Sequence, residues 1–310
     1  MRKWTRTYDG AAHGGDTAAA LGVDKYGNVT VVGSSKGAHG QDYVVIKWAS
    51  NGTRKFVWHY DGAGHADDAA TDVRVESGGT TYVTGNIKTA ALKDATYTVK
   101  FSSSGSKVWG KPYLGPSSLG ANATSIAARP AGGVYIAGWS LDAVTGMDAM
   151  VARYTSSGSG QVLPPPSLVG DDSFADLAVT SNKIVVGVGS YTVGANVQSM
   201  WLRWGSETAP PVGNPYGGGF ADAFTACTAD SSGGVYYTGY ERTAVNQSQI
   251  RTNRTSFLDM SSGFESLWGP ALGADTSTGI AASGTVVYVV GTTYKDAIEA
   301  YNQVVLIYVY

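Results

Sequence analysis

The sequence predicts an all-β protein built from six copies of one unit. Its 310 residues include 42 glycines and only 15% charged residues, a balance that favours strands and tight turns over helices. A short apolar run closed by a glycine, VTVVGSS at residues 29–35, recurs along the chain with a similar sequence. The glycines that close these runs, here called the anchor glycines, are spaced by 50 to 53 residues: Gly33, Gly85, Gly138, Gly189, Gly239 and Gly291.

Each repeat divides into four strands, so we predict a six-bladed β-propeller whose blades are four-stranded and antiparallel. In the first repeat the strands are expected at residues 18–23, 28–34, 42–48 and 54–60. Turns rich in Gly, Asn and Ser separate the first strand from the second and the third from the fourth. A period near 52 residues with only strand signals is typical of propeller blades. We expect residues 1–310 to form a single domain.

The two ends of the chain predict how the ring closes. RKWTRTYDG at the start resembles KFVWHYDG at residues 55–62, which is an outermost strand, whereas the chain ends in a third strand. We therefore expect the N-terminal strand, residues 2–9, to complete the last blade by pairing with the C-terminal strand, residues 302–310. That pairing would remove two exposed sheet edges.

The repeats resemble the bacterial β-propeller repeat family called SBBP. The resemblance rests on the phrases GNVTVVG, TTYVTG, GGVYIAG and GGVYYTG, and on DYVVIKW, DATYTVKF and DAMVARY that follow them. It covers essentially the whole chain, although the fourth and fifth repeats match less well. The resemblance implies a β-propeller from a secreted or surface-attached bacterial protein, so we expect an extracellular or cell-surface location. It implies no catalytic residues.

Composition excludes several classes of function. With 22 basic and 24 acidic residues the formal charge is −2, so no general attraction to nucleic acid is expected. No stretch approaches the ~18 consecutive apolar residues of a membrane span, so we expect no membrane insertion. No nucleophile-elbow, zinc-protease or P-loop motif is present, so no catalytic residue can be named.

The first set of candidate ligand-binding residues is aromatic. The loops after the second strand and after the outermost strand lie on one side of a blade, and these loops vary between repeats, as binding loops do. Trp139 and Tyr240 directly follow anchor glycines, and Tyr191 and Tyr294 lie slightly further along. We expect these rings at the rim of the variable face, where they could stack on a sugar. The alternative is ordinary loop packing.

Histidines on the same side give the second set. His13 and His65 are 52 residues apart, so they occupy equivalent positions, and His39 lies in a neighbouring loop. With Asp16 and Asp68 they could bind a divalent metal, calcium or zinc. The alternative is that the equivalent positions of neighbouring blades lie more than ~10 Å apart, too far for His13 and His65 to bind one ion. Repeated aspartates would then hold loops by accepting backbone N–H bonds. No other cofactor is expected.

The sequence leaves three functions open. The first is a non-enzymatic binding or scaffold propeller that uses its variable loop face for a glycan or a protein partner. The second is a hydrolase or lyase with a site at the mouth of the central channel, a possibility that rests on the fold alone. The third is a purely structural module of a larger surface assembly.

Overall fold

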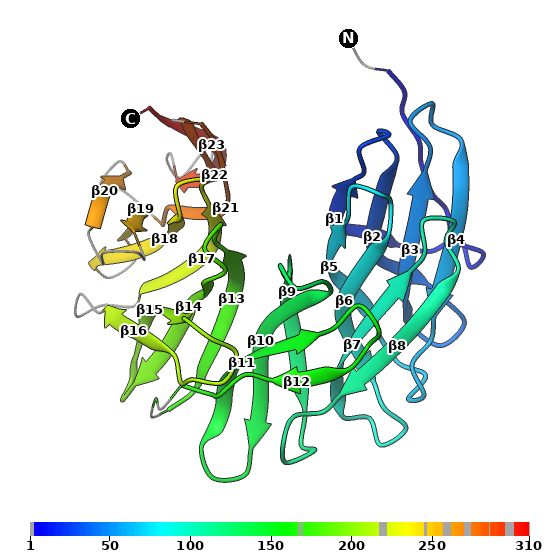
Figure 1. Ribbon diagram of the computed structural model, residues 1–310, viewed down its shortest axis with the longest axis horizontal. Helices are drawn as coiled ribbons and strands as arrows, with labels where there is room; N and C mark the ends of the chain where they lie inside the picture. The colour runs from blue at the N-terminus through cyan, green and yellow to red at the C-terminus, as the bar shows by residue number, and fades with distance from the viewer. Residues whose placement is uncertain are drawn as a thin grey trace. The chain divides into compact units, whose positions relative to one another are not determined.

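The computed structural model describes residues 3–166, 168, 170–216, 222–244, 247–256, 262–269, 274–284, 286–294 and 301–309. These residues form 23 strands in six antiparallel sheets, which confirms the all-β prediction and agrees with six predicted blades (Figure 1). Within the described ranges no helix could cross a membrane. The strands belong to two compact units, one of residues 1–144 and 152–161 and the other of residues 145–151 and 162–310.

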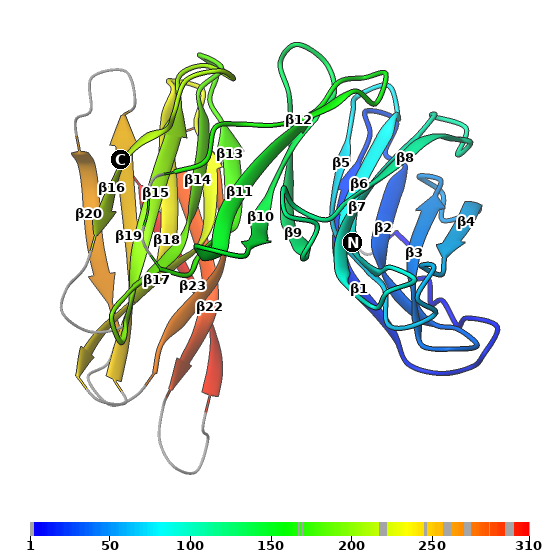
Figure 2. The same cartoon turned by 90° about the horizontal axis from the view of Figure 1, so that it is seen from below.

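The first unit contains two complete sheets, in which sequence neighbours are also sheet neighbours. Figure 2 shows the strands of these sheets from a second direction. The first sheet consists of β1 (Asp16–Val23), β2 (Val29–Lys36), β3 (Gln41–Trp48) and β4 (Arg54–Tyr60). The second consists of β5 (Ala69–Val75), β6 (Thr81–Lys88), β7 (Asp94–Phe101) and β8 (Lys107–Tyr113). The strands predicted for the first repeat agree with β1–β4 to within two residues at each end.

The third sheet contains residues of both units and keeps the same strand order. Its strands are β9 (Ala121–Ala128), β10 (Val134–Asp142), β11 (Gly146–Tyr154) and β12 (Gly160–Val162). Its outermost strand β12 is short, where the sequence runs into three consecutive prolines that cannot donate to a ladder.

The second unit holds the remaining sheets. The fourth sheet consists of β13 (Asp172–Val179), β14 (Val185–Val193), β15 (Asn196–Trp204) and β16 (Val212–Tyr216). The fifth consists of β17 (Asp222–Ala229), β18 (Gly234–Ala244), β19 (Gln247–Ser256) and β20 (Ser262–Trp268). The last has three strands, β21 (Thr276–Ser283), β22 (Val286–Tyr294) and β23 (Tyr301–Val309).

The anchor glycines mark a bulge that recurs in every sheet. Gly33 on β2 pairs with Ala18 on β1, where the register of β1 shifts before Ala20. A Cβ on Gly33 would lie only 1.9 Å from the carbonyl oxygen of Thr17. At the other five anchor glycines the corresponding distance to an inner-strand carbonyl is 1.9–2.2 Å. Because any side chain would collide with backbone, the repeat keeps glycine at this position.

Hydrogen bonds between inner strands join neighbouring sheets within each unit. In the first unit, Asp72 Oδ2 on β5 accepts a hydrogen bond of 2.9 Å from Ile126 N on β9. In the second unit, Asp176 Oδ2 on β13 accepts one of 2.8 Å from Cys227 N on β17. Apolar side chains fill the space between the first and second sheets, including the buried Val45, Val83, Val99 and Phe101. Carboxylates and interdigitated β-branched side chains thus hold each stack of sheets together.

The predicted pairing of residues 2–9 with residues 302–310 is not found in the described part of the chain. Residues 3–9 form no strand, and β23 pairs only with β22. Trp4 Nε1 instead donates to Ser50 O (2.9 Å) and Arg6 Nε to Gly52 O (2.7 Å), so this segment lies against the β3–β4 turn.

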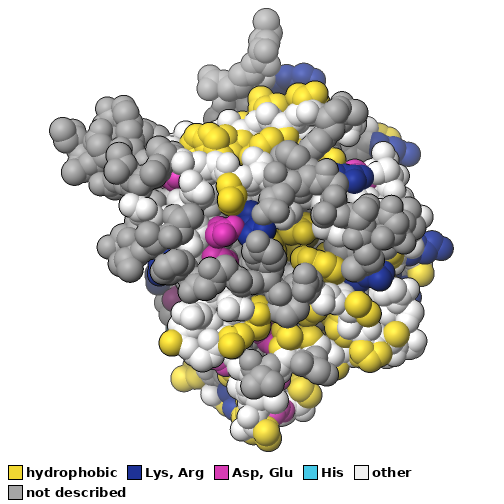
Figure 3. Space-filling view, turned by 90° about the vertical axis from the view of Figure 1, so that its left-hand side faces the viewer, with side chains coloured by type: hydrophobic (Ala, Val, Ile, Leu, Met, Phe, Trp, Pro, Cys, Tyr) yellow, Lys and Arg dark blue, Asp and Glu magenta, His cyan; other side chains and the backbone are white. Residues whose placement is uncertain are grey.

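One face of the last sheet is uncovered at β23. Val305, Ile307 and Val309 are exposed, whereas the equivalent third strand of the first sheet, β3, is buried along most of its length. Figure 3, which views the side of the second unit, shows hydrophobic side chains in surface patches between polar ones. Because alternate residues of a strand point to the same face of its sheet, these side chains mark an uncovered face of the last sheet. At its edge, β23 pairs only with β22 in the described part of the chain.

Candidate functional site

Connections on one side of the first unit's sheets form a surface that we call the loop face. Three side-chain hydrogen bonds link its successive connections: Asp67 Oδ1 accepts from Gln41 N (2.8 Å), Lys93 Nζ donates to Ser118 O (2.8 Å), and Ser117 Oγ donates to Asp142 Oδ2 (2.6 Å). Lys88 N, which directly precedes the third connection, donates to Asp68 Oδ1 (2.7 Å) in the second, so the successive connections are all linked. It consists of residues 37–40, 61–68, 89–93, 114–120 and 143–144.

The opposite side of these sheets carries tight turns that use their polar groups internally. Asp24 Oδ1 accepts hydrogen bonds from Tyr26 N (3.0 Å) and Asn28 N (2.9 Å). In later turns Thr155 Oγ1 accepts one from Ser159 N (3.1 Å). Turns of this kind leave few polar groups to recognise a ligand, so the loop face is the better candidate for binding.

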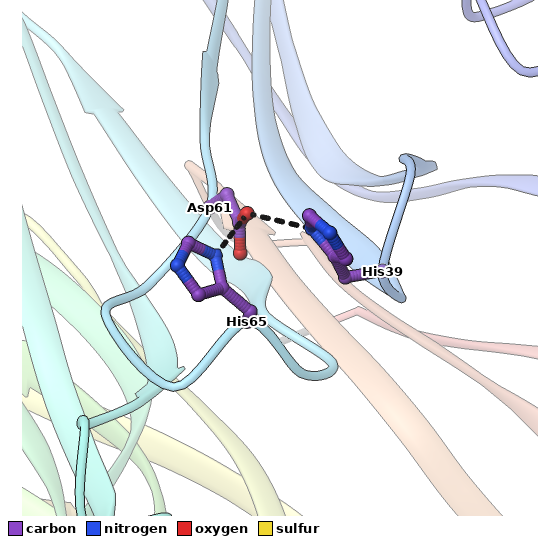
Figure 4. A group of neighbouring side chains, drawn as sticks. All are labelled: His39, Asp61 and His65. Carbon is purple, nitrogen blue, oxygen red and sulfur yellow. Dashed lines mark hydrogen bonds and ion pairs between the residues drawn. The ribbon is translucent and has the colours of Figure 1, made fainter.

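Within the loop face, two imidazoles and one carboxylate converge (Figure 4). Asp61 Oδ2 lies 2.7 Å from His65 Nδ1 and 3.5 Å from His39 Nδ1. The two imidazole rings are 5.1 Å apart between centroids and are tilted by 54°. One ligand atom from each of the three residues lies within 4.8 Å of the other two, and no other His, Cys, Asp or Glu group of the described residues does the same.

Backbone hydrogen bonds hold the two loops of this cluster in place. His65 adopts a left-handed φ of 48° and donates its N–H to Gly62 O (2.9 Å), so the chain folds back toward Asp61. The loop that carries His39 is narrowed by a bond from Gly37 N to Gly40 O (2.8 Å). A further bond, from Asp68 N to Gln41 O (2.7 Å), ties the two loops together at their bases.

The cluster lies in an acidic environment. The hydrogen bond from His65 and that residue's charge hold the pKa of Asp61 below its usual range, and the same pair raises the pKa of His65. Burial first, and then the nearby Asp61 charge, raise the pKa of Asp42. Asp61 Oδ1 is buried and accepts no hydrogen bond from the described residues. One oxygen of the Asp61 carboxylate is therefore buried without a compensating partner.

The metal candidates predicted from the sequence are only partly brought together. His39 and His65 belong to the cluster, but His13 pairs with Asp9 at 2.8 Å instead. Asp16 accepts a hydrogen bond from Gly10 N (3.0 Å), and Asp68 accepts bonds from Gly62 N and from Lys88 N (2.7 Å). These two aspartates thus bind backbone N–H groups of the loops, which is the structural role that their repetition indicates. Sequence reasoning missed Asp61, although the phrases YDGAAH and YDGAGH, 52 residues apart, contained the signal.

The four aromatic candidates lie on strands of both units. Trp139 on β10 and Tyr240 on β18 are half-buried, and Tyr191 on β14 is buried with its hydroxyl donating to Gln198 Oε1 at 2.5 Å. Tyr294 ends β22, but its side chain lies outside the described residues. The ring of Tyr191 is committed to packing, which removes one of the four proposed sugar contacts.

Comparison with solved structures shows what the chain is similar to. A glucose dehydrogenase aligns with a TM-score of 0.55 and 8% identity over 93% of this chain and 95% of its own. A structure described as YCF48 bound to D1 peptide aligns with a TM-score of 0.52 and 12% identity over 93% of this chain and 80% of its own. At these identities the likeness shows the fold alone, and it confirms a β-propeller.

Sequence comparison adds no family. No family model matches the chain, and no curated protein matches it. The resemblance of the repeats to the SBBP family therefore stays a prediction. One of the similar structures is named as an enzyme and the other as a peptide complex, so the function has to be argued from the residues of this chain.

Proposed function

We propose that this protein is a non-enzymatic binding propeller whose loop face holds a segment of a partner protein. The observation that carries this proposal is the exposure of aliphatic side chains on three connected loops. Leu92 is 62% exposed, Leu119 40% and Val144 90%. Exposed apolar groups on linked loops of a rigid scaffold are typical of protein-binding surfaces. The SBBP resemblance supports placing this binding module outside the cell or on its surface.

Two observations favour a protein partner over a glycan. The large apolar side chains exposed on the loop face are aliphatic, whereas sugar recognition depends on flat aromatic rings with free faces. Of the predicted aromatic contacts, Tyr191 is buried and bonded to Gln198. The similar solved structure of YCF48 was bound to a peptide, which is consistent with peptide binding by a propeller of this kind.

We further propose that residues 1–310 form one closed ring of six blades, with residues 3–9 as the outermost strand of the last blade. Support comes from how Trp4 and Trp109 are seated. Trp109, on the outermost strand β8, donates its indole N–H to Ser156 O (3.2 Å), as Trp4 does to Ser50 O. A Cβ on Gly158 would lie 2.9 Å from Trp109 Cγ, and one on Gly52 would lie 3.0 Å from Trp4 Cγ. Trp4 thus contacts a turn between third and fourth strands as an outermost-strand tryptophan does, which supports the proposed role of residues 3–9.

The binding proposal is tested with a random peptide library displayed on phage and selected against the purified protein. Selected peptides are then titrated against the triple variant Leu92→Asn, Leu119→Ser, Val144→Ser. We expect affinity to fall at least about tenfold, because each buried aliphatic side chain contributes ~1.5 kcal/mol or more. Asparagine is chosen at Leu92 because that residue has a left-handed φ of 57°.

The matched control for this titration is the double variant Tyr26→Ser, Val108→Ser. Both side chains are apolar and exposed to a similar degree, but they lie outside the loop face. Tyr26 lies on a turn of the opposite side, and Val108 lies on the outermost strand β8. Peptide affinity should stay unchanged in this control. Equal losses in both variants, or selection of a glycan but no peptide on parallel arrays, would contradict a protein-binding loop face.

A further inference from the structure

We propose that His39, Asp61 and His65 form a zinc site on the loop face, with the fourth coordination position open. This inference goes beyond the peptide-binding proposal and does not depend on it, because it needs only these three side chains. It also replaces the ligand set predicted from the sequence, in which Asp16 and Asp68 supplied the oxygen atoms.

The distances suit a tetrahedral ion. Ligand atoms bound to zinc at 2.0–2.1 Å lie ~3.3 Å from one another. In the structure Asp61 Oδ2 is 3.5 Å from His39 Nδ1 and 2.7 Å from His65 Nδ1. The first distance already has the required length. The second is a hydrogen bond that opens by less than ~1 Å when the ion takes the place of its proton.

The donor set favours zinc over calcium. Two imidazole nitrogens and one carboxylate oxygen are ligands that zinc and related ions bind well. Calcium needs six to eight oxygen ligands, and the cluster offers a single carboxylate. Asp61 Oδ1 is buried without a hydrogen-bond partner among the described residues, and a cation held at Oδ2 would offset the cost of this unpaired carboxylate oxygen.

The surrounding charge favours a cation. The carboxylates of Asp42 and Asp68 lie near Asp61, within the range of its charge. Asp67, which precedes Asp68, accepts a hydrogen bond from Gln41 N beside the cluster. A divalent ion in such a group of carboxylates relieves their mutual repulsion.

A second copy of the Asp–His pair shows which part of the cluster is special. His13 and Asp9 stand 52 residues before His65 and Asp61, and their Nδ1–Oδ2 distance is 2.8 Å. His13 also has the same left-handed backbone, with φ of 50°. The pair by itself therefore belongs to the turn of the repeat. Only the second copy is joined by a third ligand, His39, among the residues that the structure describes.

The coordination position left open faces solvent. The side chains of His39 and His65 are 60% and 63% exposed, and Asp61 is the innermost ligand at 30%. Zinc sites with three protein ligands keep water or an external donor in the fourth position. A bound ion could therefore accept a histidine or carboxylate from a partner segment lying on the loop face.

The test is calorimetric titration of the metal-free full-length protein with zinc chloride, followed by visible absorption with cobalt, whose tetrahedral complexes absorb strongly. We expect one ion per chain and an intense cobalt spectrum. Asp61→Asn should abolish binding, and His39→Ala and His65→Asn should each weaken it at least about tenfold. The matched control is His13→Asn, which alters the equivalent pair and should leave zinc affinity unchanged.

Each outcome decides the proposal. Because His39 lies on an exposed loop, the His39→Ala variant should have the melting temperature of the wild-type protein. An unchanged zinc affinity in that variant would therefore overturn a three-ligand site. Equal losses in His13→Asn and His65→Asn would show binding by the repeated pair and not by the cluster. Absence of any heat, or a cobalt spectrum without the tetrahedral bands, would refute the site outright.

Discussion

At the scale of single residues, one recurring aspartate explains much of how the loops are held. Asp16, Asp68, Asp172 and Asp222 begin or directly precede an inner strand and accept hydrogen bonds from backbone N–H groups. Asp172 does so at the greatest electrostatic cost. Burial, followed by the charges of Asp148 and Asp171, raises the pKa of Asp172 to about 6 despite its bond from Ala149 N.

This raised pKa predicts a pH dependence of stability. Between about pH 4 and 6 the folded state binds the proton of Asp172 more tightly than the unfolded state, so stability falls as pH rises through that window. A shift of about two pKa units corresponds to about 3 kcal/mol. Asp172→Asn keeps an acceptor for Ala149 N–H and carries no charge. Relative to wild type, the variant should therefore gain about 2–3 kcal/mol between pH 4 and pH 7.5.

Urea unfolding of both proteins at the two pH values measures this difference. Other titrating groups are common to both proteins, so their contributions cancel in the comparison. A stability difference that stays constant with pH would show that the pKa of Asp172 is the same in the folded and the unfolded protein.

At the scale of elements, the sequence carried most of what determines each sheet. Strand positions followed from apolar runs and Gly/Asn/Ser turns, because both signals act within a few residues. The bulge opposite Gly33 could not be predicted, since it depends on how closely β1 approaches β2. The cluster of His39, Asp61 and His65 was only half predicted for the same reason. Its loops are joined by the contact between Gln41 and Asp68, which sequence periodicity does not contain.

The bulge gives a prediction at this scale. In Gly85→Ala the new Cβ would lie 2.2 Å from Ala69 O and 2.7 Å from the Tyr43 ring, inside the packed interface of the first two sheets. We expect a loss of about 3 kcal/mol or more in the free energy of unfolding. Gly78→Ala is the matched control, because a Cβ there meets nothing within 4 Å. Similar stabilities of the two variants in denaturant unfolding would disprove the steric origin of the anchor glycines.

At the scale of the whole molecule, the open question is where the outermost strand of the last sheet comes from. The chain start has the sequence of an outermost strand, and Trp4 is seated like Trp109, yet residues 3–9 form no strand. Closure depends on an encounter between segments almost 300 residues apart, and local patterns carry no information about its geometry. The repeat nevertheless fixes the register that closure would require.

That register can be tested by cross-linking. In the first sheet Tyr43 pairs with Tyr60. Tyr8 is equivalent to Tyr60, because it precedes Tyr60 by one repeat of 52 residues. Gln303 is equivalent to Tyr43, because each directly precedes the residue that pairs with its anchor glycine. These pairs are Val304 with Gly291 and Val44 with Gly33. Closure therefore places Tyr8 opposite Gln303, at the Cα separation of ~5 Å that a disulfide requires.

We expect the double variant Tyr8→Cys, Gln303→Cys to form an intrachain disulfide on mild oxidation, seen as a linked peptide by mass spectrometry. The native Cys227 is buried, and burial raises the pKa of its thiol, so it should not compete. In the control Tyr8→Cys, Val309→Cys the second thiol lies six residues further along, ~20 Å away in a strand, and should stay reduced. Equal oxidation of both pairs would indicate a mobile N-terminal segment. Covalent dimers would instead show that the open edge of β23 takes its strand from a second copy.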